Sequence, residues 1–309
     1  MLGIVLSLGS AVVFGANSII TRRGVLRVSS SYVATISILT GSLFFVLVTA
    51  ATGDLFAIAQ LPLKAYLYWG LSGVVHFALG RTWAYRSLKY LGSNRSNVVT
   101  SLSPIATVAL AMVVLKETVT PLQFVGILLT LSGPLLMLLK EQTSPSESSP
   151  TKSSSYGKEI DARTLLLGVV YGAGAAVFWG SSAIFIKFGL EAGGSPVAGT
   201  LISYAAASLI VGPSTLLYTE ERRELFSENR KSLEVSVFSG LTTGVAQLLR
   251  YLSLAHGSVI VVSLMLRTLP LWVLFFAFIF NREYESFSRW VFLGNGLLMV
   301  GTIMVMLGG

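Results

Sequence analysis

Residues 85–117 read YRSLKYLGSNRSNVVTSLSPIATVALAMVVLKE, and the landmarks of this stretch occur twice in the chain. The second copy lies 166 residues further on and keeps a tyrosine, a mid-segment proline and a terminal basic–acidic pair. The matched positions are Tyr85 with Tyr251, Ser87 with Ser253, Leu88 with Leu254, Pro104 with Pro270, and Lys116-Glu117 with Arg282-Glu283. Because self-similarity at a fixed period marks a duplicated structural unit, the chain is predicted to contain two copies of one unit.

A second block of matches lies nearer the start of each copy, at an offset of 165 residues. It consists of small, aromatic and basic residues in the same order. The matched positions are Gly9 with Gly174, Phe14 with Trp179, Gly15 with Gly180, Arg22 with Lys187, and Gly24 with Gly189. Two blocks with nearly the same offset indicate that the duplication covers a whole unit.

The composition places the chain among integral membrane proteins. Of its 309 residues, 53% are hydrophobic and 12% are charged, and the mean hydropathy is +0.74. Soluble domains carry about 25% charged residues and need polar surface to cover their core. The chain has no cysteine and two histidines, so disulfides, thiolate sites and a metal centre are not expected. The net charge of +8 is interpreted as loop residues that set membrane orientation, not as a nucleic-acid-binding surface.

A hydrocarbon core about 30 Å thick requires roughly 20 apolar helical residues per crossing. Ten such spans are predicted, at residues 2–21, 29–52, 63–84, 96–115, 119–139, 164–186, 196–218, 233–254, 258–280 and 288–308. Residues 140–163 divide them five and five; this polar stretch contains SPSESSPTKSSS and is predicted to be a flexible linker. The predicted domains are therefore a first five-helix repeat at 1–139 and a second at 164–309. Because most other connections are short, consecutive helices are expected to pack as neighbours.

Each copy has an odd number of spans, so the second copy must enter the membrane from the opposite face. This predicts an inverted-topology repeat. Sixteen of the 22 lysines and arginines lie in the connections after spans one, three, five, seven and nine, against three on the opposite side. Cytoplasmic loops carry an excess of Lys and Arg, so both termini are predicted to be extracytoplasmic. The expected membrane is the plasma (cell) membrane, with the lipid bilayer as immediate partner.

These features resemble the drug/metabolite transporter (DMT) superfamily, and its EamA-type branch in particular. The resemblance is carried by the two duplicated blocks and by four late glycines, Gly126, Gly133, Gly294 and Gly301. It implies a ten-helix secondary transporter with a central cavity between its repeats, which moves small organic solutes. The chain departs from the family in two respects. Members usually have both termini in the cytoplasm, and their second helix often carries an arginine, which residues 35–41 lack.

Ionisable side chains at membrane depth are costly, and each is therefore a candidate functional residue. Arg267 is the tenth residue of the predicted ninth span, deeper than an arginine stem reaches comfortably by snorkelling. It is interpreted as a ligand for a substrate anion; structural pairing with helix-end carbonyls or an acid is the alternative. Arg250 is a second candidate. Arg81 and Lys187 lie nearer span ends, where snorkelling or interfacial anchoring is the competing interpretation.

Pro104 and Pro270 lie near the middle of their spans at matched positions. A proline lacks an N–H donor and clashes with the carbonyl four residues before it, so both are predicted hinges. Broken helices at matched positions of a repeat point to the binding site. Four further residues complete the predicted substrate site because they are polar and near these prolines, or aromatic at repeated positions. They are Asn97, Ser101, Trp179 and Tyr251.

The predicted function is secondary transport by alternating access, as an exporter or exchanger of a small polar organic metabolite, amino-acid-like or otherwise anionic. A small multidrug-type efflux carrier is the first alternative, but it needs a membrane carboxylate, and all 14 acidic residues lie in loops or at span ends. A polytopic membrane enzyme or structural subunit is the second, and it lacks a nucleophile–base set at membrane depth. No nucleotide-binding motif occurs, and no catalytic residue, metal ligand or cofactor is predicted.

Overall fold

The computed structural model describes residues 1–25, 30–84, 86–87, 90, 99–100, 102–141, 162–217, 230–280 and 289–308. Within these residues the secondary structure is helical, and no strand occurs. The first half contains α1 (Leu2–Val25), α2 (Ser30–Thr52), the short α3 (Asp54–Ile58), α4 (Leu63–Gly73), the π-helical η1 (Val74–Gly80), α6 (Ser103–Val114) and α7 (Pro121–Glu141). The second half contains α8 (Ala162–Glu191), α9 (Pro196–Leu217), α11 (Arg230–His256), α12 (Val259–Met265), η2 (Leu266–Thr268), α13 (Leu269–Phe280) and α14 (Arg289–Leu307).

The predicted all-helical membrane fold is confirmed, and each of the ten predicted spans overlaps one of these helices or a run of consecutive ones. Four described stretches are long and apolar enough to cross a membrane by length and composition; they are Tyr32–Thr52, Arg163–Glu191, Pro196–Pro213 and Val259–Phe276. Shorter apolar helices occupy other spans. Large apolar side chains face outward, and Leu43, Leu166 and Leu209 are 62%, 64% and 76% exposed. Such surface is stable in lipid and costly in water.

The two copies interlock through glycines on their first helices. A Cβ on Gly15 of α1 would lie 2.6 Å from the Cβ of Trp272 in α13, and one on Gly180 of α8 would lie 2.9 Å from the amide nitrogen of Thr107 in α6. Gly15 and Gly180 are matched positions. The contact that Gly15 of the first copy makes with the second copy is therefore repeated by the contact that Gly180 of the second copy makes with the first. The first helix of each copy therefore packs on the fourth helix of the other.

This interlocking corrects the expectation that consecutive helices pack as neighbours. α1 packs mainly on α11 and α13 and only marginally on α2, while α8 packs on α4, η1 and α6 and only marginally on α9. Short connections restrict where the next helix begins, but the closest packing partner is decided by where small residues allow two backbones to approach.

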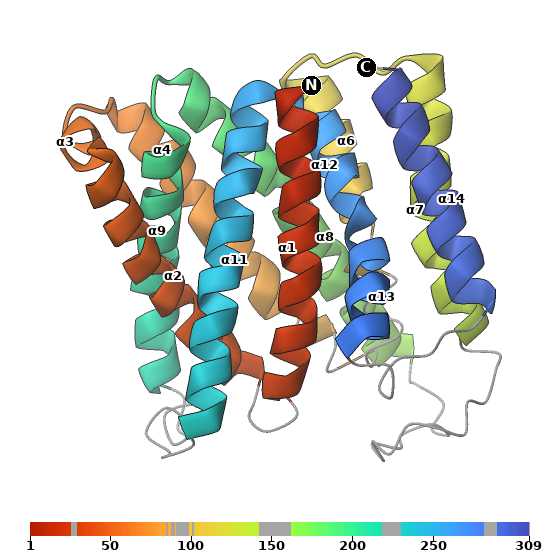
Figure 1. The fold of residues 1–309 in the computed structure, drawn as a ribbon, viewed down its shortest axis with the longest axis horizontal. Helices are drawn as coiled ribbons and strands as arrows, with labels where there is room; N and C mark the ends of the chain where they lie inside the picture. Colours follow the sequence, from red (N-terminus) through yellow and green to blue (C-terminus); the bar gives the residue numbers. More distant parts are fainter. Residues whose placement is uncertain are drawn as a thin grey trace.

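The fifth helices of the two copies, α7 and α14, form a pair of their own (Figure 1). Their backbones approach at the four late glycines, because a Cβ on Gly126 would lie 2.7 Å from the carbonyl oxygen of Gly301. Gly133 and Gly294 make the corresponding contact. Small residues of this kind permit close helix packing in lipid, where burial of apolar surface drives little association.

The two copies run in opposite directions through the bundle. Gly3 at the start of α1 lies against Gly257, and Lys187 near the end of α8 donates to the carbonyl oxygen of the same Gly257 at 3.5 Å. The start of one first helix and the end of the other therefore share one end of the bundle. Figure 1 shows the start of α1 and the end of α14 at that same end.

The orientation of the whole bundle can be tested by topology reporters. Because the sequence predicts that sixteen of the 22 basic residues lie in connections on the side away from the termini, a reporter fused after Gly309 is expected to behave as extracytoplasmic. A reporter inserted near Ser148 is expected to behave as cytoplasmic. Paired alkaline phosphatase and green fluorescent protein fusions at both sites measure this, and a fluorescent carboxyl-terminal fusion would show the usual family topology instead.

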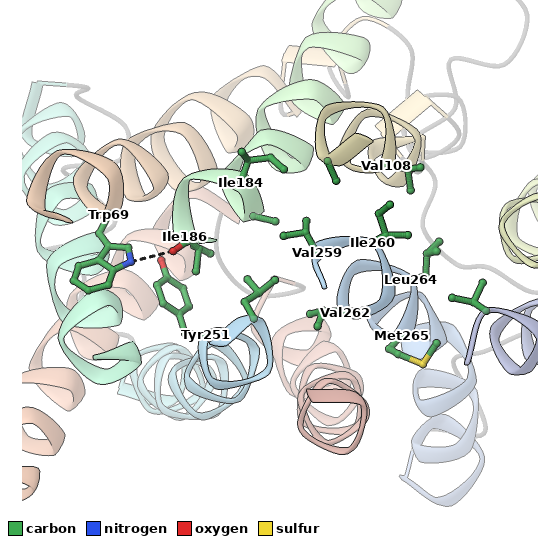
Figure 2. Close-up of a cluster of buried hydrophobic side chains, with 14 of the residues drawn as sticks. Trp69, Val108, Ile184, Ile186, Tyr251, Val259, Ile260, Val262, Leu264 and Met265 are labelled. Atoms are coloured by element: carbon green, nitrogen blue, oxygen red, sulfur yellow. Dashed lines mark hydrogen bonds between the residues drawn. The ribbon is translucent and has the colours of Figure 1, made fainter. Parts of the chain in front are cut away.

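The buried core lies between the copies and draws residues from α4, α6, α8, α11 and α12 (Figure 2). Trp69 is fully buried and donates from its indole Nε1 to the carbonyl oxygen of Ile186 at 3.3 Å. Val259, Ile260 and Leu264 of α12 extend this cluster toward α6 and α8. The core therefore holds α12, the first part of the ninth span, in place.

Candidate functional site

The ninth span is interrupted just before Pro270. α12 ends at Met265, the residues of η2 form a single 3₁₀ turn, and α13 begins at Leu269. Pro270 has no N–H to donate to the carbonyl of Leu266, and this carbonyl instead accepts from the N–H of Leu269. In the first copy, Pro104 occupies the first turn of α6, where its missing donor costs nothing. The predicted break therefore occurs at Pro270, and Arg267 lies within it.

A cavity of about 360 Å³ lies beside this break, between the two copies. It is lined from α1, η1, α6, α7, α8, α11, α12, η2 and α13. Thr130 and Leu131 show that α7, the fifth span, also contributes to the walls. The polar lining residues are His76, Thr107, Thr130, Gln247, Arg250, Ser263 and Arg267.

Two arginines are the charged residues of this lining, and no Asp or Glu occurs among the described residues that line the cavity. Arg267 donates from Nη2 to the hydroxyl of Ser103 at 2.9 Å, which joins η2 of the second copy to α6 of the first. Its Nε is buried and has no hydrogen-bond partner within the described part of the chain. The guanidinium therefore keeps donor capacity that the protein does not use.

Arg250 of α11 is 8% exposed and lies among neutral partners. It donates from Nη2 to the hydroxyl oxygen of Ser182 at 3.0 Å and from Nη1 to the side-chain oxygen of Gln247 at 3.4 Å. Among the described residues, neither Arg250 nor Arg267 lies within 4.0 Å of a carboxylate. Both cations are thus held by hydrogen bonds whose acceptors carry no charge.

His76 of η1 also lines the cavity and shares a partner with Arg250. Its Nδ1 lies 3.0 Å from the hydroxyl oxygen of Ser182. Trp179, another lining residue, donates from its indole Nε1 to the carbonyl oxygen of His76 at 3.1 Å. A polar cluster therefore joins η1, α8 and α11 along one wall of the cavity. Sequence reasoning missed His76 and Gln247; a histidine inside a predicted span was the available signal.

The predicted site residues fall into three groups. Arg267, Arg250, Trp179 and Pro270 line the cavity. Tyr251, Arg81 and Lys187 lie elsewhere, and Pro104 is buried in the first turn of α6. Asn97 and Ser101 lie outside the described residues.

Three of these side chains make contacts of their own away from the cavity. The hydroxyl of Tyr251 donates to the hydroxyl oxygen of Ser203 at 2.7 Å inside the core, and the guanidinium of Arg81 lies 6.0 Å from the ring centre of Phe77. Lys187 donates to the carbonyl oxygen of Leu254 at 3.2 Å, in the last turn of α11. A lysine at a helix C-terminus satisfies free carbonyls and offsets the helix dipole, which favours the anchoring interpretation for Lys187.

Glu117 joins the two copies at the end of the bundle that carries the termini. After a turn at Lys116, whose φ is 57°, the Glu117 carboxylate accepts from the N–H groups of Val259 at 2.7 Å and Ile260 at 3.0 Å. A carboxylate at a helix N-terminus satisfies free donors and interacts favourably with the dipole. Lys187 binds the carbonyl oxygens of Leu254 and Gly257, just before the residues that Glu117 binds. The two side chains therefore hold the short segment between α11 and α12 from both sides, and Glu117 makes the contact between the copies.

A helical membrane bundle built from two inverted copies, with a broken helix and a polar cavity between them, has the architecture of an inverted-repeat membrane transporter. Comparison with known proteins identifies the family to which the chain belongs. The chain belongs to the EamA-like transporter family, whose sequence profile matches residues 1–139 and 166–307. It is a multi-pass membrane protein of that family.

Curated relatives and solved structures are similar over different lengths. The protein named "Uncharacterized inner membrane transporter YhbE" from Escherichia coli (strain K12) is 28% identical over 222 residues, as are its counterparts in Escherichia coli O157:H7 and Shigella flexneri. The match covers 72% of this chain and 63% of each relative. One solved structure, titled only "Crystal structure of protein", has a TM-score of 0.78 at 13% identity, and covers 99% of this chain and 97% of its own. This last likeness concerns the fold alone.

Proposed function

We propose that the protein is a secondary carrier that exports or exchanges a small organic anion by alternating access between its two copies. The observation that carries this proposal is the pair of arginines in the cavity, with no carboxylate among the described lining residues. The family and the description of the curated relatives as inner membrane transporters support transport and a location in the plasma membrane. A substrate that supplies the missing negative charge would complete the site.

The energetic argument begins with desolvation. A guanidinium removed from water is costly unless a counter-charge or good acceptors compensate it. Arg267 has one hydroxyl acceptor and a buried Nε without a described partner. A bound carboxylate would accept two parallel N–H bonds from such a fork, an arrangement that arginine favours and lysine cannot reproduce.

The apolar part of the lining indicates the rest of the substrate. Phe14, Leu131, Trp179, Leu266 and Leu269 contribute apolar walls to the cavity. Ligand sites typically combine such walls with a few polar groups that orient the ligand. We therefore favour a carboxylate with a compact apolar body. An amino acid would also fit, with its ammonium group facing neutral oxygen acceptors such as those of Gln247 and Ser263.

The two alternative functions find less support. A small multidrug-type carrier of organic cations would need an acid to oppose its substrate, and two arginines repel a cation. A membrane enzyme would need a nucleophile with an activating base. His76 does lie 3.0 Å from the Ser182 hydroxyl, but that hydroxyl donates to the Trp179 carbonyl at 2.8 Å and accepts from Arg250. The serine is therefore engaged as a hydrogen-bond link.

Three ligands of one shape test the charge requirement. Isocaproate, its neutral amide isocaproamide, and leucine share a branched body, and each of the last two differs from isocaproate in a single group. Calorimetric titration into full-length protein in lipid nanodiscs is expected to show isocaproamide binding at least about tenfold more weakly than isocaproate, because a charged hydrogen-bond partner is lost. Leucine is expected to fall between them. Equal affinity for the acid and the amide would contradict an anion site.

Transport itself needs a probe that does not leak across lipid in a neutral form. Isopentylsulfonate is permanently ionised and keeps a similar branched body. Counterflow of labelled isopentylsulfonate into proteoliposomes is expected with this protein and not with empty vesicles. Binding without counterflow would remove the carrier proposal and favour a membrane receptor or subunit.

A further inference from the structure

The duplication allows His76 to be compared with its counterpart in the second copy. At an offset of 166 residues His76 corresponds to Thr242, and at an offset of 165 Ser182 corresponds to Asn17. Thr242 donates from its hydroxyl to the side-chain oxygen of Asn17 at 2.8 Å, while His76 and Ser182 lie 3.0 Å apart. The same cross-copy hydrogen bond therefore occurs twice, once with a titratable group and once without.

This comparison separates the packing role from any further role of His76. A threonine and an asparagine are sufficient to join the first helix of one copy to the third span of the other. A histidine is therefore not required for that contact. It occurs only in the half of the molecule where the hydrogen bond also includes Arg250, and where the side chain lines the cavity.

The hydrogen bonds of Ser182 identify which nitrogen of His76 is free. The Ser182 hydroxyl donates its hydrogen to the carbonyl oxygen of Trp179 at 2.8 Å. Its oxygen accepts from Arg250, and with its own hydrogen directed to Trp179 it can bond to His76 only as an acceptor, so we assign the hydrogen of the neutral ring to Nδ1. In the neutral ring Nε2 is therefore an acceptor, and within the described residues no hydrogen-bond partner is assigned to it. Nε2 is available to receive a proton in a side chain that lines the cavity.

Several charged or titratable groups surround this imidazole. Arg250 faces it from α11, and Arg81 follows η1 in the same span. Tyr204 of α9 packs on the neighbouring Phe77 at 5.0 Å between ring centres, Tyr251 of α11 is bonded to Ser203, and Arg267 lines the same cavity. The fixed charges among these groups are positive, so a second positive charge on His76 needs a compensating anion.

We propose that His76 takes up a proton on Nε2 when an organic anion binds between Arg250 and Arg267, so that proton and anion bind and cross together. This inference rests on the proposed function. The proton comes from water on the side to which the cavity is open, and no covalent bond other than N–H forms. Binding linkage is reciprocal: if the anion favours the proton, the proton favours the anion by the same factor, typically about 5- to 150-fold.

The coupling has a consequence for direction. Because proton and anion cross in the same direction, an inward proton gradient drives uptake. Net export then depends on a higher internal concentration of the anion or on exchange for an external one. Proton coupling through a histidine also requires no carboxylate at membrane depth.

Proton uptake is measured by titrating isocaproate into the full-length protein at one pH in buffers of different ionisation enthalpy. Isocaproate is fully ionised near neutral pH, so protons taken up must go to the protein. At the pH of greatest uptake, the wild-type protein is expected to take up about 0.4 proton per anion for a coupling factor of 5 and about 0.85 for a factor of 150. H76T/S182N, which installs the threonine–asparagine pair found at the matched positions Thr242 and Asn17, is expected to take up about none and to lose the pH dependence of its affinity.

Two further variants keep the test decisive. His76→Gln keeps an amide donor toward Ser182 but cannot titrate, so the same loss of proton uptake is expected even if the double variant folds poorly. His256→Asn changes an exposed histidine outside the cavity and is expected to leave proton uptake unchanged. Wild-type binding without proton uptake, or uptake that persists in either His76 variant, overturns this inference and leaves the anion carrier standing. Failure of wild type to bind isocaproate overturns both.

Discussion

Replacing Arg267 with alanine is expected to abolish measurable affinity for the anionic substrate while the protein still folds and inserts. Truncating one partner of a hydrogen-bonded charge pair typically costs about 2–5 kcal/mol, or roughly 30-fold to several thousand-fold in affinity. The folded state loses only the neutral bond to Ser103 and one buried, unsatisfied nitrogen, which limits the structural penalty. Isocaproate titration and counterflow measure the loss.

Arg267→Lys separates charge from geometry. The lysine keeps a positive charge but presents a point charge in place of a planar fork, so binding is expected to be weak rather than absent. Arg230→Ala is the matched control, because Arg230 is an exposed arginine in an i,i+4 pair with Glu234 at the surface. Normal isocaproate affinity in a well-folded Arg267→Ala protein would contradict the proposal that Arg267 binds the anion. A lower melting temperature with unchanged affinity would assign Arg267 a structural role.

Glu117→Gln is expected to open the cavity toward the end of the bundle that carries the termini. The carboxylate accepts from two N–H groups at the start of α12, across the boundary between the copies. A hydrogen bond to a charged group contributes about 1.5–3 kcal/mol, so weakening one of them shifts a closed–open equilibrium by roughly 10- to 160-fold. Opening at this end is the movement that alternating access requires.

The absence of cysteine from the chain makes this measurable. A cysteine in place of Ser263, which lines the cavity, is labelled by a membrane-impermeant maleimide only when the cavity is open to the reagent. Combining Ser263→Cys with Glu117→Gln is expected to speed labelling from the side of the termini. Glu234→Gln, which removes an exposed carboxylate, is the control. Equal labelling rates in Glu117→Gln and the parent would show that this contact does not hold the end closed.

Pro270 and Arg267 have properties that can be read from the chain alone. A proline at mid-span removes a donor from its own helix, and an arginine ten residues into a span is deep by count alone. Both properties are local, so the break and the buried charge were predictable from the chain. The repeated position of Tyr251 predicts a place in the site, and in the structure its hydroxyl is bonded to Ser203 in the core. Repetition identifies a position and does not say which way its side chain points.

Lys187 and His76 are two further side chains whose partners cannot be identified from the sequence. The sequence is compatible with Lys187 as a substrate ligand or as an anchor, and its 3.2 Å contact with the carbonyl oxygen of Leu254 identifies its partner. His76 received no role from the sequence, because its partner Ser182 lies 106 residues away in the other copy. A pair so distant in the chain has no spacing that a pattern can recognise.

Hydropathy, period and the parity of the span count are properties of the chain alone, so the membrane class, the spans, the duplication and its inversion follow from the amino-acid order. Which helices meet depends on the folded bundle. Gly15 and Gly180 let the first helix of each copy approach the fourth helix of the other, and this interlocking brings His76, Ser182 and Arg250 to one wall of the cavity. Close packing in lipid depends on how well the surfaces of two helices that are far apart in the sequence fit together, and this fit cannot be read from either helix alone.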